Sequence, residues 1–144
     1  MAKSKAKILV VDDNSGIRAA LKVLLPLHFS QVELIPSPKE LVTKMADFRP
    51  DVVLLDMNFH TDINTGNEGL FWLSEIKKRS PDTEVVLFTA YADIQLAVEG
   101  MKRGAFDFIV KPWDNDKLVE TLKAAYDRTG KKAKAAVAPS SMKM

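Results

Sequence analysis

Four short apolar runs in this chain each end in residues that can bind a metal ion or a phosphoryl group. Asp12 and Asp13 follow ILVV, Asp56 follows VVLL, Thr89 follows VVLF and Lys111 follows FIV. If the runs are parallel strands of one sheet, their carboxyl ends lie at the same edge. Three carboxylates brought together there would repel one another, and a divalent cation would relieve the repulsion. Oxygen ligands of this kind suit Mg²⁺ best, and Mn²⁺ is tolerated.

Such a set of side chains predicts phosphoryl-transfer chemistry. A metal ion, an ammonium and a hydroxyl around one carboxylate can stabilise a transferring phosphoryl group, and the carboxylate can attack it to give an aspartyl phosphate. Each residue also has an ordinary explanation. Asp12 and Asp13 would cap a helix, and Lys111 with the following proline would form a turn. Asp56 would begin a loop, and Thr89 would be a common strand residue. The occurrence of all the required residue types, each at a strand end, favours the chemical interpretation.

The apolar periodicity predicts five strands alternating with five helices. The strands are expected over residues 7–12, 32–36, 51–56, 83–90 and 105–111, and the helices over residues 15–25, 37–48, 69–79, 92–104 and 114–128. Pro26 ends the first helix. Ser37 before a proline begins the second helix, Gly104 ends the fourth and Asp114 caps the fifth.

Three of the predicted strands contain the runs ILVV, VVLL and EVVLF, which, after the glutamate that opens the third, are continuously apolar instead of alternating. Such strands are typical of a parallel sheet covered by helices on both faces. Together with the strand–helix alternation they predict a doubly wound α/β fold, in which ligands bind outside the carboxyl ends of the strands. The strand over residues 32–36 ends without a functional polar group, so we expect it at an outer position.

Composition and charge limit the classes of protein to which this chain can belong. The 144 residues fit one domain with a tail. Residues 8–122 contain 12 Lys/Arg and 18 Asp/Glu, a net charge of −6, whereas both ends of the chain are basic. An acidic body argues against direct nucleic-acid binding by this domain. The lack of cysteine excludes disulfides and thiol catalysis. No apolar run is long enough for a membrane span or a signal peptide, so we expect a cytoplasmic protein.

Four segments, ILVVDDN, DVVLLDMN, VVLFTAY and GAFDFIVKPW, together resemble the receiver domain of bacterial two-component response regulators over residues 6–127. The resemblance implies a five-stranded, CheY-like parallel sheet of order 2-1-3-4-5. It implies that Asp56 accepts a phosphoryl group from a sensor histidine kinase or a phosphotransfer protein. It further implies that Mg²⁺ is bound by Asp12, Asp13, Asp56 and the Asn58 carbonyl. Phosphoryl binding and switching are implied for Thr89, Lys111 and Phe108. The rim of the site would consist of Asn14, Ala90 and Tyr91, and the peptide before Pro112 would be cis.

The segment TAYADIQLAVEGMKRGAFDFIVKPW is most similar to receivers of NtrC-like transcription activators. The likeness implies a transcriptional output, and we expect a homodimer contact through the fourth helix, fifth strand and fifth helix. We expect the basic residues 128–144 to be a flexible tail or a truncated linker. The domain itself is expected to be a signalling module and not an enzyme, with at most self-phosphorylation and self-dephosphorylation.

One segment departs from the receiver pattern. Residues 57–68 form a longer connection than the usual receiver turn and lack its proline. We expect Asp62 and Glu68 to belong to a solvated loop and not to the metal site. We hypothesise that the greater length of the loop changes partner choice or the rate of dephosphorylation. The two histidines, His28 and His60, are expected to have structural or surface roles.

Two other functions remain open at this point. A haloacid-dehalogenase-like phosphatase also uses a strand-end aspartate, but it requires a second aspartate two residues later, where this chain has Asn58. A pseudo-receiver that only binds partners would be expected to lack one of the acids or the lysine, and this chain has all of them.

Overall fold

The computed structural model describes residues 3–57 and 68–129, in which strands and helices alternate. The strands are β1 (Ser4–Val11), β2 (Phe29–Ile35), β3 (Val52–Asp56), β4 (Glu84–Ala90) and β5 (Asp107–Lys111). The α-helices are α1 (Ser15–Leu24), α2 (Leu41–Asp47), α3 (Glu68–Arg79), α4 (Ile94–Lys102) and α5 (Asn115–Arg128), and short 3-10 helices are η1 (Leu25–Leu27), η2 (Pro38–Glu40) and η3 (Tyr91–Asp93).

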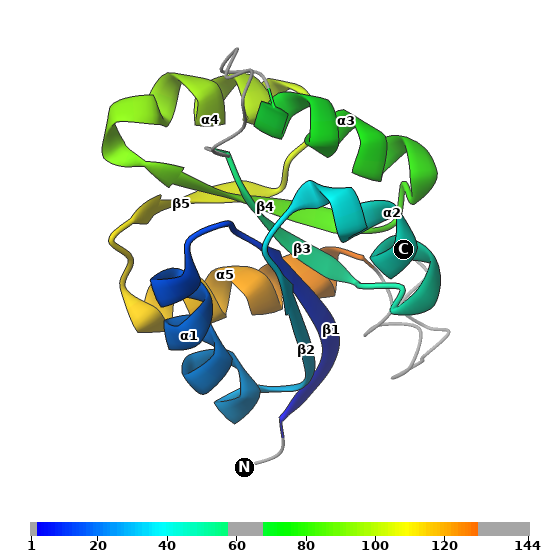
Figure 1. The fold of residues 1–144 in the computed structure, drawn as a ribbon, viewed down its shortest axis with the longest axis vertical. Helices are drawn as coiled ribbons and strands as arrows, with labels where there is room; N and C mark the ends of the chain where they lie inside the picture. Colours follow the sequence, from blue (N-terminus) through cyan, green and yellow to red (C-terminus); the bar gives the residue numbers. More distant parts are fainter. Residues whose placement is uncertain (1–2, 58–67, 130–144) are drawn as a thin grey trace, which may run out of the picture.

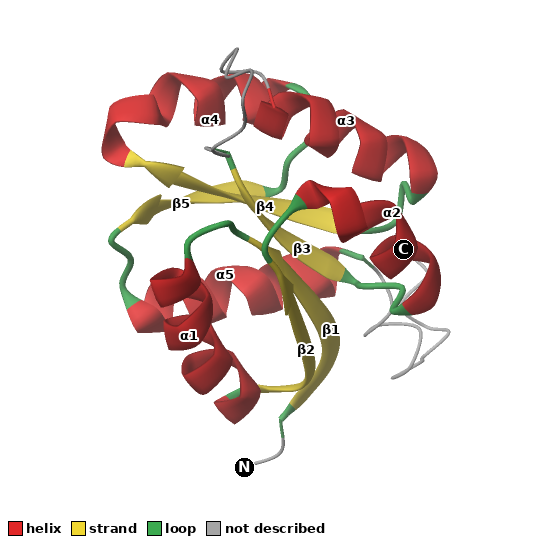
Figure 2. Ribbon diagram, viewed as in Figure 1, coloured by secondary structure: helices red, strands yellow, loops and turns green. Residues whose placement is uncertain are grey.

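The strands form one parallel sheet of order β2-β1-β3-β4-β5. Helices α1 and α5 cover one face of the sheet, and α2, α3 and α4 cover the other (Figure 1; Figure 2). The predicted doubly wound fold is therefore confirmed, as is the outer position of β2. In the described part of the chain, no helix is long and apolar enough to cross a membrane.

The sheet separates two apolar cores, and this explains why the central strands are continuously apolar. Ile8 and Val10 of β1 pack into the core beneath α1 and α5, whereas Leu9 and Val11 pack into the core beneath α2, α3 and α4. All four side chains are fully buried. Successive residues of a strand point to opposite faces, so a strand buried on both sides needs apolar residues at every position.

Several element boundaries differ from the sequence prediction. Strand β2 begins at Phe29 and not at residue 32, because backbone pairing with β1 extends to Ser4 and Phe29. Helix α4 begins at Ile94, since residues 91–93 form η3 instead of its first turn. Ser37 and Asp114 each accept a hydrogen bond from a backbone N–H in the following turn, as predicted, but Ser37 caps the 3-10 helix η2, and α2 begins only at Leu41. Gly104 has a φ of +107°, which suits a glycine after a helix end.

The start of α3 packs unusually closely against the chain that leaves β3. A Cβ atom placed on Gly69 would lie 2.6 Å from Met57 Sδ and 2.9 Å from Met57 Cα. We therefore expect Gly69→Ala to lower the free energy of unfolding by about 1–3 kcal/mol, the usual cost of overpacking. Chemical denaturation would measure the change. Gly16→Ala is the matched control, because Gly16 is likewise the second residue of a helix but its Cβ would meet only Asn14 Oδ1, at 3.2 Å. Equal effects of the two substitutions would contradict the packing argument.

Candidate phosphoacceptor and metal site

Strand register brings the polar strand ends together at one edge of the sheet. Val11, the last residue of β1, pairs with Leu55, and the next residue of β3, Asp56, pairs with Phe88 of β4. The last residue of β5, Lys111, pairs with Ala90. The carboxyl ends of four adjacent parallel strands therefore meet where the sequence predicted a site.

Three carboxylates gather at this edge. Asp12, Asp13 and Asp56 each offer an oxygen atom, and these atoms lie within 4.8 Å of one another. The exposed fraction is 0% for Asp12 and 1% for Asp56, while Asp13 is half-buried. Carboxylate oxygens at this spacing are the donor set that Mg²⁺ uses, and Mg²⁺ keeps several waters in addition to its protein ligands. The three residues therefore fit a divalent cation.

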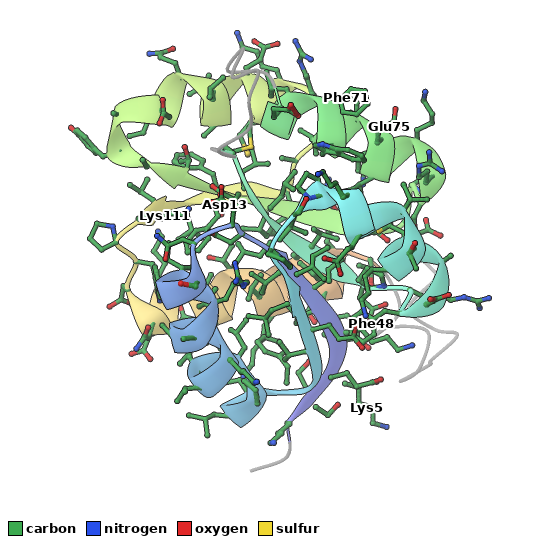
Figure 3. The ribbon with its side chains drawn as sticks, in the orientation of Figure 1. Lys5, Asp13, Phe48, Phe71, Glu75 and Lys111 are labelled. Atoms are coloured by element: carbon green, nitrogen blue, oxygen red, sulfur yellow. The ribbon has the colours of Figure 1, made fainter. Side chains whose placement is uncertain are left out.

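Lys111 bridges the two buried carboxylates. Its Nζ lies 2.9 Å from Asp12 Oδ2 and 3.0 Å from Asp56 Oδ1. Figure 3 shows Lys111 and Asp13 close together above the start of α1. Burial lowers the pKa of Lys111, but attraction to Asp56 and Asp12 outweighs that effect and raises the pKa above its ordinary value of 10.5. The ammonium group thus remains charged at neutral pH and compensates part of the acidic cluster.

The raised pKa of Lys111 makes stability depend on alkaline pH. A group whose pKa is higher in the folded state stabilises the fold fully below its unfolded pKa, about 10.4 for lysine, and ceases to do so as pH rises through the folded pKa. We expect the free energy of unfolding, measured with EDTA present, to fall more steeply above about pH 10.5 in the wild type than in Lys111→Met. Parallel curves for the two proteins would contradict this assignment.

Asn14 and Arg18 tie the acidic residues to α1. Asp12 Oδ1 accepts a hydrogen bond from the Asn14 N–H at 2.9 Å, and Asn14 Oδ1 accepts one from the Ile17 N–H at 2.9 Å. Asn14 is therefore the helix cap, and the alternative in which Asp12 and Asp13 are the capping residues is wrong. Arg18 Nη1 donates to the Asp12 carbonyl oxygen at 2.8 Å. Sequence reasoning missed Arg18, although its position one helical turn after the cap was a usable signal.

Thr89 and Phe108 belong to the opposite face of the sheet from Lys111, the face that α2, α3 and α4 cover. Thr89 is fully buried, and its hydroxyl donates at 3.4 Å to the carbonyl oxygens of Ala90 and Asp93, which directs it toward η3. The half-buried Phe108 packs against the core beneath α3 and α4. Tyr91 is 78% exposed.

The peptide bond between Lys111 and Pro112 is cis. Glu68 is the first residue of α3 and does not join the acidic cluster. His28 follows η1, and its backbone N–H donates to the Leu25 carbonyl. The predicted carbonyl ligand Asn58, together with His60 and Asp62, lies outside the described residues.

Sequence reasoning also missed Phe88, which lies beneath the bridging lysine. Lys111 Nζ is 4.8 Å from the centroid of the Phe88 ring. Both residues belong to the face that α1 and α5 cover, as their neighbours Val86 and Ile109 do. No motif marks a phenylalanine for this role, since VVLF is also the pattern of an ordinary buried strand.

Comparison with known proteins agrees with this geometry. Residues 8–123 match the family model described as the response regulator receiver domain. The regulatory protein AtoC of Escherichia coli is 34% identical over 112 residues, which are 78% of this chain and 23% of AtoC. The DNA-binding transcriptional regulator NtrC of Salmonella typhimurium is 34% identical over 118 residues, which are 82% of this chain and 24% of NtrC. The chain thus spans about a quarter of the length of these relatives.

Two solved structures show the same likeness. The N-terminal signal receiver domain of a two-component response regulator from Bacteroides fragilis is 57% identical with a TM-score of 0.78, covering 85% of this chain and 98% of that one. NtrX from Brucella abortus is 30% identical with a TM-score of 0.78, covering 92% of this chain and 29% of that one. Receiver domains bind Mg²⁺ at a cluster of acidic residues and are phosphorylated by histidine kinases. The chain belongs to the response regulator receiver domain family and is a signalling domain of the NtrC-like kind.

Proposed function

We propose that Asp56 is the residue that accepts the phosphoryl group, from a sensor histidine kinase or a phosphotransfer protein, and that its phosphorylation switches a transcriptional output. The observation that carries the proposal is the meeting of Asp56, Asp12, Asp13 and Lys111 at the carboxyl edge of the sheet. Asp56 lies at the end of its strand, next to the ammonium group, which is the position a nucleophile needs.

The residues divide the chemistry between them. An Asp56 oxygen attacks the phosphorus atom of phosphohistidine, the P–N bond breaks, and its electron pair returns to the imidazole nitrogen. The Lys111 ammonium, 3.0 Å from Asp56, is placed to bind a phosphoryl oxygen and stabilise its charge. When bound by the acidic residues, Mg²⁺ supplies further positive charge to the transferring oxygens.

The metal ligands in this proposal are Asp12, Asp13, Asp56 and the carbonyl of Asn58, with Mg²⁺ as the physiological ion and Mn²⁺ as a substitute. We expect Asp13→Asn to weaken Mg²⁺ binding about tenfold or more, because a unit charge near the ion contributes on the order of 1–4 kcal/mol. The same substitution should raise metal-free stability by relieving like-charge repulsion.

Titration calorimetry and denaturation in EDTA would measure the two effects of Asp13→Asn. Asp82→Asn removes one charge from an exposed position before β4, at the opposite edge of the sheet, and serves as the control. Unchanged Mg²⁺ binding in Asp13→Asn would exclude this residue from the metal site.

Thr89 and Phe108 are proposed to transmit the change. The Thr89 hydroxyl now donates to the carbonyls of Ala90 and Asp93, and a phosphoryl group on Asp56 offers it stronger acceptor oxygens. Movement of the hydroxyl would free η3 and open space for the Phe108 ring, so that phosphorylation biases the surface of α4, β5 and α5. This surface carries partly exposed Val98 and Met101 and is the proposed homodimer contact. Residues 6–127 are the proposed domain, and residues 128–144 the proposed tail or linker.

Acetyl phosphate tests the proposed function directly. With Mg²⁺, the wild-type protein should gain about 80 Da, the mass of one phosphoryl group, and peptide mapping after borohydride reduction should place it at Asp56. EDTA should prevent the gain. Absence of the adduct under all conditions would favour the pseudo-receiver, and steady turnover of a phosphate ester such as p-nitrophenyl phosphate would favour the phosphatase.

A further inference from the structure

We propose that Phe88 is a positioning residue for Lys111: the face of its ring holds the ammonium group where it can meet Asp12 and Asp56. The inference rests on the proposed function, since it assigns the residue that orients a phosphoryl-binding group. The Phe88 ring is fully buried, and the Lys111 ammonium lies 4.8 Å from its centroid. A cation within about 6 Å of an aromatic ring face is attracted by the ring quadrupole.

The ring of Phe88 is itself held in place. The rings of Phe88 and Trp113 are tilted by 58° with centroids 5.3 Å apart, and Trp113 Nε1 donates to Asn115 Oδ1 at 2.9 Å. The Phe88 carbonyl oxygen accepts a hydrogen bond from the N–H of Met57, the residue after Asp56, at 2.9 Å. One strand residue therefore fixes both the backbone beside the acceptor and the surface beneath the lysine.

A lysine needs such a support because its side chain is long and flexible. Immobilising it costs rotamer entropy, and the Lys111 side chain is 17% exposed, so water competes with the carboxylates for the ammonium group. Attraction to Asp12 and Asp56 holds the ammonium when the carboxylates are free. A divalent cation held by these carboxylates would weaken their attraction for Lys111, and the contact with the ring would then contribute more to its position.

Fluorination of the Phe88 ring tests the attraction with little change of shape. Phenylalanine with one, two and three fluorine atoms can be incorporated at position 88 of the full chain, and each fluorine weakens the ring quadrupole. The rate constant for adduct formation with acetyl phosphate and Mg²⁺ should fall stepwise, reaching about fivefold for the trifluoro ring, which corresponds to about 1 kcal/mol. The same series at Phe29, a fully buried ring in the same core, is the matched control and should leave the rate unchanged.

A second readout does not depend on phosphorylation. The ¹⁹F resonance of 4-fluorophenylalanine at position 88 should shift when Lys111→Met removes the cation, while the resonance of the same probe at position 29 should not. A flat rate series at position 88 would overturn the positioning role of Phe88 even if the wild-type protein is phosphorylated normally. Failure of the wild type to form any adduct would instead contradict the proposed function, and the inference would fall with it.

Discussion

Asp56→Asn is expected to abolish the phosphoryl adduct formed with acetyl phosphate and Mg²⁺. The amide has nearly the shape of the carboxylate, but it is not a nucleophile at neutral pH and carries no charge to bind the metal. Asp56 is 1% exposed and contacts Lys111, so an isosteric change keeps the packing of the strand end. Because Lys111 retains Asp12 as an ion-pair partner, the variant should remain folded. Intact mass measured over time would show the loss.

Asp116→Asn provides the matched control for Asp56→Asn. It makes the same chemical change at an exposed residue in the first turn of α5, away from the acidic cluster. This variant should form the adduct at the wild-type rate. An adduct of undiminished yield on Asp56→Asn would place the acceptor on a different residue, and peptide mapping would identify it.

The carboxylate and lysine part of the site could be predicted from the sequence because it depends on strand ends. Continuous apolar runs identify buried parallel strands, and parallel strands bring their carboxyl ends to one edge. Asp12, Asp56 and Lys111 each occupy or follow the last position of such a run, so their meeting required only the fold. In the structure, Lys111 Nζ lies within hydrogen-bond distance of both carboxylates, as that prediction requires.

Other features depend on side-chain orientation, which sequence patterns do not contain. Thr89 lies next to the last residue of β4, close to its predicted place at the strand end. Its hydroxyl, however, donates to the Asp93 carbonyl of η3, a 3-10 helix whose last two residues the apolar periodicity had assigned to the fourth helix. Arg18 reaches the Asp12 carbonyl through a rotamer that only the packed structure defines. The contact of Phe88 with Lys111 joins two residues that are far apart in the chain, so neither local spacing nor residue type predicts it.

Lys111→Met should produce the largest loss of stability among the substitutions at the site. It leaves the buried carboxylates of Asp12 and Asp56 without their cation, and removing one partner of a buried ion pair costs about 3–5 kcal/mol. We expect a loss near the lower end, about 3 kcal/mol, because part of the lysine side chain reaches solvent. Urea denaturation in EDTA would measure it. Adduct formation should slow roughly 100-fold, as for removal of one stabilising donor.

Mg²⁺ and a double substitution separate the electrostatic cause from lost packing. Mg²⁺ should stabilise Lys111→Met more than the wild type, because the ion binds better where no ammonium competes for the carboxylates. Asp12→Asn combined with Lys111→Met removes one buried charge together with its partner, so the double variant should regain part of the stability lost by Lys111→Met alone. If the double variant is instead as unstable as the two single losses added together, the ion pair is not what stabilises this edge, and the lysine stem contributes by packing against Phe88 alone.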